Sequence, residues 1–339
     1  MLDVGQGDSI LIRTPAGKAI LIDAGTGETK IPKLLTGLGV TSLDLVVATH
    51  PHADHIGGMD DVLDSLPVKN YIDNGLPHTT QTYEGVMQRI EAKHIAYKAA
   101  VVGQTFNLDD GTKLEVLFPT GTPLKNTRSD LNSNSVVTRL THGDDCFLFT
   151  GDSEEVTEQA LLSKGLGQCD VLKVAHHGGK YSSTPAFLAA VKPKIALISV
   201  GTGNTYGHPT DEALGRLTGV GAKVYRTDLD GMITAYSSGK GVKVETSKAK
   251  VAGAAAAPAA KDAKADPTAT SHPRHDLDPA AVDAMPEEAC AFPSSSTSEV
   301  FHEAGCGNAA RISPANLVCY QTREQAIAAG KRPAGCCKP

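Results

Sequence analysis

The sequence lacks the features that mark a membrane protein or a broadly basic nucleic-acid-binding protein. Its 339 residues contain no run of about eighteen apolar residues, which excludes a predicted membrane span. The first residues are not a basic segment followed by an apolar one, so this numbering shows no signal peptide. The net charge of −6 excludes a global basic field, and any contact with nucleic acid has to be local.

Cysteine is scarce through most of the chain. Cys146 and Cys169 stand alone in residues 1–250, and we expect both to be inert thiols of the core. The other cysteines lie toward the C-terminus: Cys290, Cys306, Cys319, Cys336 and Cys337. The chain opens at residues 1–4 as if in the middle of a strand. We therefore expect a leader and a first edge strand upstream, the alternative being a natural start without that strand.

Potential metal ligands are concentrated in one stretch, T-H-P-H-A-D-H at residues 49–55. Residues 43–48 before it form a short β-branched apolar run typical of a buried strand, and residues 59–63 after it have helical spacing. The ligands therefore lie on a loop between a strand and a helix. Imidazole and carboxylate groups suit zinc, manganese and iron, and a loop can bring them to one point.

The spacing of these side chains predicts two adjacent ions. His50 and His52 alternate like residues at a strand end, so both can reach one ion. Asp54 and His55 come from the following turn and can reach a second ion, and we also assign Asp54 a catalytic role. A solvated, histidine-rich loop without metal is the alternative.

The motif H-x-H-x-D-H, followed by I-G-G, resembles the metal signature of the metallo-β-lactamase superfamily. The resemblance implies an α/β fold, the αββα sandwich, with two divalent metal ions. It also implies a supporting role for Asp23, because in the superfamily this aspartate lies beneath the metal site and orients its loop. From the residues alone, Asp23 is equally well a turn residue at the end of the strand of residues 19–22.

Further ligands are predicted where other strands end. Asp152 follows an apolar strand, and it either bridges the two ions or caps the helix of residues 154–162. Beside the histidine cluster we favour the bridge. His176 and His177 end the strand of residues 170–175. Because side chains alternate along a strand, only one of them can face the site, and we assign His177 as the ligand and His176 as its support.

Two more residues are assigned to the site. His208 precedes a helix capped by Thr210, where its ring can face an anionic substrate and assist the leaving oxygen, so we predict that it is catalytic. Asp8, in the segment G-Q-G-D, either fixes the orientation of the ligands or belongs to a simple β-bulge.

The whole series of motifs resembles one branch of the superfamily, the soluble metal-dependent domain of the ComEC DNA-uptake family. The motifs are L-D-V-G-Q-G-D, I-D-A-G, T-H-P-H-A-D-H-I-G-G, N-S-V-V, F-T-G-D, L-K-V-A-H-H-G and Y-G-H-P. The resemblance implies hydrolysis of a phosphodiester, DNA, by metal-activated water. This chain departs from that family because it carries no membrane segment, so it is a stand-alone relative.

A second departure concerns the ligand count. Many superfamily members carry a separate histidine between the cluster and Asp152, and here no histidine in that interval lies in a comparable motif. Asn134 or a water takes its place. The resulting oxygen-rich site favours manganese or a weakly held zinc.

The domain organisation follows from composition. We assign residues 1–247 to the hydrolase domain and residues 248–290, rich in Ala and Pro, to a flexible linker. Residues 291–339 resemble the small metal-binding module of the Ada repair protein. The predicted ligands of a structural zinc there are His302, Cys306, Cys336 and Cys337, and disulfides among the five tail cysteines are the alternative.

These features favour a dinuclear metal-dependent nuclease or phosphodiesterase that acts on DNA. A hydrolase of another ester, lactone or amide on the same fold is the alternative. A non-catalytic binding protein would have lost a ligand, whereas the cluster of residues 50–55, Asp152 and His177 are all present. The tail cysteines and the expected leader predict a secreted, extracytoplasmic protein, and the sequence indicates no protein partner.

Overall fold

The computed structural model describes residues 1–108 and 111–248, together with residues 292–295, 300–302, 317–320, 326 and 331–333 of the C-terminal part. Contacts between residues divide the chain into two units, Met1–Ala257 and Pro258–Pro339. Among the described helices, none combines the length and the apolar character that a membrane crossing needs.

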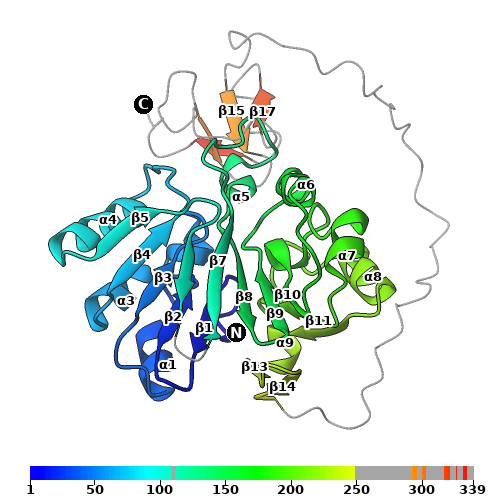
Figure 1. Ribbon diagram of the computed structural model, residues 1–339. Coiled ribbons are helices and arrows are strands. Elements are labelled where there is room, and N and C mark those ends of the chain that lie inside the picture. The colour runs from blue at the N-terminus through cyan, green and yellow to red at the C-terminus, as the bar shows by residue number, and fades with distance from the viewer. Residues whose placement is uncertain are drawn as a thin grey trace. The chain divides into compact units, whose positions relative to one another are not determined.

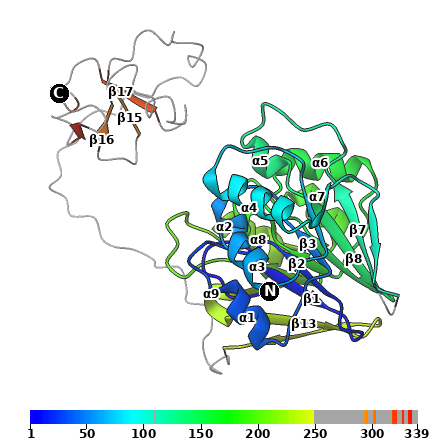
Figure 2. The same cartoon turned by 90° about the vertical axis from the view of Figure 1, so that its left-hand side faces the viewer.

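The first sheet of the N-terminal unit has the strand order β1-β2-β3-β4-β5. Its strands are β1 (Ile10–Arg13), β2 (Ala19–Ile22), β3 (Leu45–Val47), β4 (Asn70–Asp73) and β5 (Ala96–Ala99). β1 and β2 form an antiparallel hairpin, and β2 to β5 run parallel. The connecting helices are α1 (Ile31–Gly37), α2 (Ala53–Ile56), α3 (Met59–Ser65) and α4 (Gln81–Ala92). Figure 1 and Figure 2 show α1, α3 and α4 on the outer side of this sheet.

The second sheet has the strand order β12-β11-β10-β9-β8-β7-β6. The strands are β6 (Thr105–Asn107), β7 (Lys113–Phe118), β8 (Val137–His142), β9 (Asp145–Phe149), β10 (Val171–Lys173), β11 (Ile195–Ile198) and β12 (Lys223–Arg226). β6 to β9 pair antiparallel, and β9 to β12 pair parallel. The helical segments are α5 (Asp130–Ser133), α6 (Glu155–Ser163), the 3₁₀ turn η2 (Ala175–Gly178), α7 (Pro185–Val191), α8 (Asp211–Gly219) and α9 (Thr227–Asp230).

Two smaller sheets complete the described residues. In the N-terminal unit, β13 (Ile233–Ser237) and β14 (Val242–Thr246) form a hairpin. In the C-terminal unit, the strand order is β17-β15-β16-β18. These strands are β15 (Phe292–Ser295), β16 (Val300–Phe301), β17 (Leu317–Tyr320) and β18 (Arg332–Pro333).

Alternating side chains bury both faces of each large sheet. In β2, Ile20 and Ile22 pack in the apolar layer between the sheets, whereas Leu21 packs in the layer beneath α1, α3 and α4. In β10, Val171 joins the layer between the sheets, and Leu172 packs with the residues of α7. The layers therefore run helix, sheet, sheet, helix, and the predicted αββα sandwich is confirmed.

The parallel strands explain where polar side chains gather. Carboxyl ends of neighbouring parallel strands lie at the same edge of a sheet, where the connecting loops meet. The first sheet brings the residues after β2 and β3 to this edge, and the second brings the residues after β9, β10 and β11. The backbone N–H of Val136 donates to Thr49 O at 2.9 Å, which joins the loops of the two sheets.

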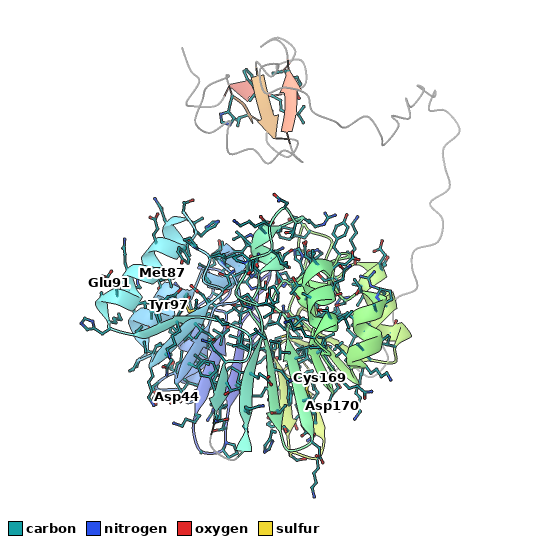
Figure 3. The ribbon with its side chains drawn as sticks, turned by 45° about the horizontal axis from the view of Figure 1, so that its top comes forward. Asp44, Met87, Glu91, Tyr97, Cys169 and Asp170 are labelled. Atoms are coloured by element: carbon teal, nitrogen blue, oxygen red, sulfur yellow. A yellow bond between two sulfur atoms is a disulfide. The ribbon has the colours of Figure 1, made fainter. Side chains whose placement is uncertain are left out.

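A disulfide links Cys146 in β9 to Cys169, which precedes β10, with 4.8 Å between the two Cα atoms. The prediction that these residues are inert thiols of the core was wrong, because the parallel pairing of β9 with β10 brings together residues 23 positions apart. The backbone N–H of Cys146 also donates to Oδ2 of Asp170 at 3.1 Å. Cys169 and Asp170 are labelled in Figure 3.

We predict that the change Cys146→Ser with Cys169→Ser lowers the free energy of unfolding by about 3 kcal/mol, because a closed loop of this length restricts the unfolded chain. Chemical denaturation with and without a reductant measures the effect. The reductant should destabilise the parent protein and leave the double variant unchanged. Equal stability of the parent under both conditions would show that the disulfide does not stabilise the fold.

Candidate metal centre

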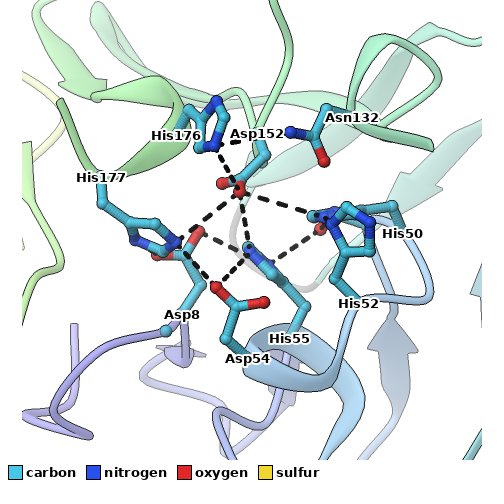
Figure 4. Close-up of polar contacts among 12 residues, drawn as sticks. Asp8, His50, His52, Asp54, His55, Asn132, Asp152, His176 and His177 are labelled. Atoms are coloured by element: carbon cyan, nitrogen blue, oxygen red, sulfur yellow. Dashed lines mark hydrogen bonds and ion pairs between the residues drawn. The ribbon is translucent and has the colours of Figure 1, made fainter. Parts of the chain in front are cut away.

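Histidine and aspartate side chains from both sheets meet at the carboxyl ends of the strands (Figure 4). The residues come from the segment before β1, the loop between β3 and α2, helix α2 itself, the turn after β9, and η2. Figure 4 shows them as Asp8, His50, His52, Asp54, His55, Asp152, His176 and His177. Donor atoms of Asp54, His55, Asp152 and His177 all lie within 4.8 Å of one another.

Asp152 lies at the centre of this group. Its Oδ2 atom is 3.2 Å from His55 Nε2, 3.6 Å from His177 Nε2, and 4.0 Å from Nε2 of both His50 and His176. His50 and His52 lie to one side of Asp152 and His177 to the other (Figure 4). A single carboxylate oxygen thus faces imidazoles on both sides, as a carboxylate that bridges two cations would.

Glycine at position 151 lets Asp152 reach this place. Gly151 has φ +52°, and a Cβ there would lie 2.9 Å from Thr49 Cβ and 3.0 Å from Ser135 Cβ. The backbone N–H of Asp152 donates to Ser135 Oγ at 3.1 Å. The N-cap of α6 is Glu154, so Asp152 is not the helix cap that the sequence left open as an alternative.

Asp23 holds the loop that carries the histidines. Its two carboxylate oxygens accept hydrogen bonds from the backbone N–H and the hydroxyl of Thr49, each at 2.7 Å. Oδ2 also lies 2.7 Å from His55 Nδ1. This contact leaves His55 Nε2 facing Asp152, so Asp23 lies beneath the site as the superfamily resemblance implies.

His177 is oriented by the backbone of the neighbouring strand. Its Nδ1 atom lies 2.9 Å from Ser199 O, which can only accept, so Nδ1 carries the proton. Nε2 then points into the site, 3.2 Å from Oδ2 of Asp54. A histidine whose other ring nitrogen donates to a carbonyl is typical of metal ligands.

His176 and His177 both face Asp152, so the expectation that only one can do so was wrong. The alternation of a strand does not apply here, because the two residues have left-handed φ values of 51° and 53° within η2. His176 Nδ1 also lies 3.6 Å from Oε1 of Glu154. The sequence H-H-G-G offered one clue, since a backbone turn at glycine often follows a strand end.

Asn134 does not join the cluster in the way that the missing histidine suggested. Its Oδ1 accepts from the N–H of Leu124, and its Nδ2 donates to the carbonyls of Leu124 and Asp130. The amide is therefore committed to the backbone of α5 and of the loop before it. Asn132 lies closer to the centre, with Nδ2 at 3.5 Å from His176 Nε2.

The sequence reading missed a buried cation, Lys173 of β10. Its ammonium pairs with the carboxylate of Asp8, donates to Gly151 O at 3.0 Å, and lies 3.9 Å from Oδ1 of Asp152. Asp8 in turn lies 3.5 Å from His177 Nδ1 and 3.8 Å from His55 Nδ1. Asp8 is thus buried beneath the ligands, and a charged residue inside the apolar strand V-L-K-V-A was the available signal.

The donor set fits divalent metal ions. Burial lowers the pKa of His50 and His52, so both rings are neutral ligands at pH 7. Burial also opposes protonation of His55, but the carboxylates of Asp152 and Asp23 outweigh it and raise its pKa well above the usual value. The site therefore attracts positive charge, and among the described residues His55 Nε2 and Asp152 Oδ1 have no hydrogen-bond partner.

His208 lies at the rim of this centre. Its ring centroid is 5.3 Å from that of His176 and 6.3 Å from that of His177. Burial, together with the neighbouring His176 and His177, lowers the pKa of His208 to about 4. The ring is therefore neutral at pH 7. As the sequence predicts, Thr210 caps the following helix, α8.

The predicted tail ligands receive no structural test. Cys306, Cys336 and Cys337 lie outside the described residues. His302 follows β16 and is half-buried. A structural zinc and a set of disulfides both stay predictions for this module.

The N-terminal unit is similar in sequence to known proteins. A family model described as the metallo-beta-lactamase superfamily matches residues 2–202. Competence protein ComA of Neisseria gonorrhoeae is 35% identical over 250 residues, which cover 72% of this chain and 33% of that protein. ComE operon protein 3 of Bacillus subtilis is 31% identical over 254 residues, covering 69% and 32%. The chain spans about a third of the length of these curated relatives.

Among solved structures, the metallo-beta-lactamase fold protein YhfI from Bacillus subtilis is similar with a TM-score of 0.43 and 14% identity. The match covers 65% of this chain and 88% of that one.

We predict that Lys173→Met lowers the free energy of unfolding by about 3–5 kcal/mol, because it leaves the buried carboxylate of Asp8 without its cation. The double change Asp8→Asn with Lys173→Met should recover most of this loss. Denaturation in the presence of a chelator makes the measurement independent of bound metal.

The exposed ion pair of Lys194 with Asp170, 2.8 Å long, provides a matched control. Lys194→Met should cost less than about 1 kcal/mol. A double variant as unstable as Lys173→Met alone would mean that the lysine acts by packing and not by balancing Asp8.

Proposed function

The chain belongs to the metallo-β-lactamase superfamily, and we propose that it is a dinuclear metal-dependent phosphodiesterase that hydrolyses DNA. The observation that carries this proposal is the position of Asp152 Oδ2 between His50 and the pair His55 and His177. The motif resemblance to the DNA-uptake family and the match to competence protein ComA support a DNA substrate.

Two groups of residues would hold the ions, which we propose to be zinc or manganese. His50, His52 and Asp152 would hold one, and Asp54, His55, Asp152 and His177 the other. Bound ions would supply an activated water at neutral pH and positive charge for the phosphate oxygens. The protein's part is to fix these side chains beforehand, which Asp23 does for His55 and Ser199 O does for His177.

We assign the catalytic roles to Asp54 and His208, which are only partly buried. Burial would raise the pKa of Asp54, but His177 and His55 outweigh it and lower that pKa, so the carboxylate stays ionised and accepts hydrogen bonds. It can therefore orient a water molecule by accepting its proton in a hydrogen bond. His208 is neutral and offers a ring N–H to a phosphate oxygen or to the leaving oxygen, without a permanent charge.

We also propose that the protein works outside the cytoplasm. The disulfide between Cys146 and Cys169 supports this location. Disulfides persist in oxidising compartments and are rare where thiols are kept reduced.

We predict that the protein hydrolyses linear DNA and bis(p-nitrophenyl) phosphate with manganese or zinc, and that excess chelator abolishes turnover. Asp54→Ala should lower kcat by about a hundredfold or more, since even residues that only orient ligands contribute about 10- to 100-fold. Asp61→Ala, a change at a half-exposed carboxylate of α3, is the matched control and should retain full activity.

Initial rates on these two substrates, and on a lactone and a p-nitrophenyl ester, decide between phosphodiesters and other substrates. Metal-dependent cleavage of the lactone or ester with intact phosphodiesters would replace the proposal by the alternative hydrolase.

A further inference from the structure

Tyr181 carries two cations on an exposed ring beside the metal centre. Tyr181 is 41% exposed, and the guanidinium carbon of Arg128 lies 3.2 Å from the centroid of its ring. The ammonium of Lys180 lies 4.9 Å from the same centroid. Such cation–π contacts hold these two exposed cations near the ring.

This cluster is attached to the residues that follow Asp152. The backbone N–H of Glu155 donates to Tyr181 O at 3.1 Å, and the hydroxyl of Ser182 donates to Ser153 O at 2.8 Å. Glu154 lies between Ser153 and Glu155 in the chain. Glu154 in turn lies 3.6 Å from His176 Nδ1.

A second exposed aromatic residue, Tyr206, is connected to His176 through His208. Tyr206 is 69% exposed, and its ring stacks on His208 with a centroid distance of 6.0 Å and an interplanar angle of 26°. His208 then meets His176 edge-on at 5.3 Å. Asn204 fixes this loop, because its Oδ1 accepts from the N–H groups of both Tyr206 and His208.

We propose that these two flanks, Arg128 with Lys180 and Tyr181 on one and Tyr206 with His208 on the other, are nucleotide subsites for a single-stranded nucleic acid. The proposal rests on the phosphodiesterase function proposed above and extends it. Tyr206 and His208 reach His176 beside Asp152, and the loop of Tyr181 is joined to residues 153–155 directly after Asp152. Nucleotides held on both flanks would therefore place the linking phosphate at the metal centre.

The chemistry of the flanks favours single strands. Exposed aromatic rings bind unpaired bases by stacking, and a duplex keeps its base faces stacked on one another. Arg128 and Lys180 supply positive charge for the backbone phosphates beside the stacking ring. With a net charge of −6, the chain attracts a polyanion only where cations gather. Asp130, the first residue of α5, accepts hydrogen bonds from the backbone N–H and the hydroxyl of Thr127.

Binding of a labelled oligothymidylate of about twelve nucleotides, followed by fluorescence anisotropy with the full-length protein, tests the subsites directly. The double variant with Arg128→Ala and Tyr181→Ala should have a Kd that is about tenfold higher or more. The loop keeps its backbone contacts in this variant, because Arg216 donates to the carbonyls of Lys180, Ser182 and Ser183. Thermal unfolding checks that the variant is folded.

Lys223→Ala provides the matched control, because Lys223 lies over Tyr225 at 5.0 Å on β12, in another cation–π pair. It should leave the Kd unchanged. An unlabelled duplex of the same length should compete at least about tenfold less well than the single strand. Equal Kd values for the parent and the Arg128 and Tyr181 double variant, or equal competition by the duplex, would overturn the proposal.

Hydrolysis separates this inference from the proposed function. For a single-stranded oligonucleotide, the ratio of its kcat/KM to that for bis(p-nitrophenyl) phosphate should fall by about tenfold in the double variant. A protein that binds the single strand through these residues but cleaves neither substrate would retain the subsites and refute the phosphodiesterase. A protein that cleaves both with an unchanged ratio would refute the subsites alone.

Discussion

The structure depends on how negative charge is balanced where the two sheets meet. Asp8, Asp23 and Asp152 are buried, and Asp54 lies at the edge of the same cluster. Lys173 is buried inside this cluster and forms an ion pair with Asp8. Charges buried without partners cost several kcal/mol each, so the remaining carboxylates require further cations. Without metal, His55 meets part of this need by a raised pKa.

The αββα order brings these carboxylates together and also provides the backbone contacts that hold them in place. Parallel strands in both sheets end at one edge, so loops far apart in sequence contribute carboxylates to one place. Backbone contacts join these loops: Val136 N–H donates to Thr49 O, and Ser199 Oγ donates to Gly7 O at 2.7 Å. Side chains held by such contacts need little rearrangement when a cation enters.

The sequence predicted those features that depend on local patterns. The spacing of residues 50–55 identified the cluster, and the ends of apolar strands identified Asp152 and His177 as candidates. The sequence did not predict the features that depend on tertiary contacts. The left-handed backbone at His176 brings both histidines to the site, and the loop before α5 uses the amide of Asn134. Lys173 was overlooked because its partner, Asp8, lies 165 positions away.

Metal content is the measurement that tests this account most directly. The full-length protein is loaded with excess manganese, which unlike zinc does not favour the thiolates of the tail, and freed of unbound ions. Elemental analysis of the parent and of Asp152→Asn then gives the number of ions per chain. The account predicts two divalent ions per chain in the parent and a loss of at least one in the variant. A folded parent that retains no metal, or a variant that retains as much as the parent, would contradict the central role of Asp152.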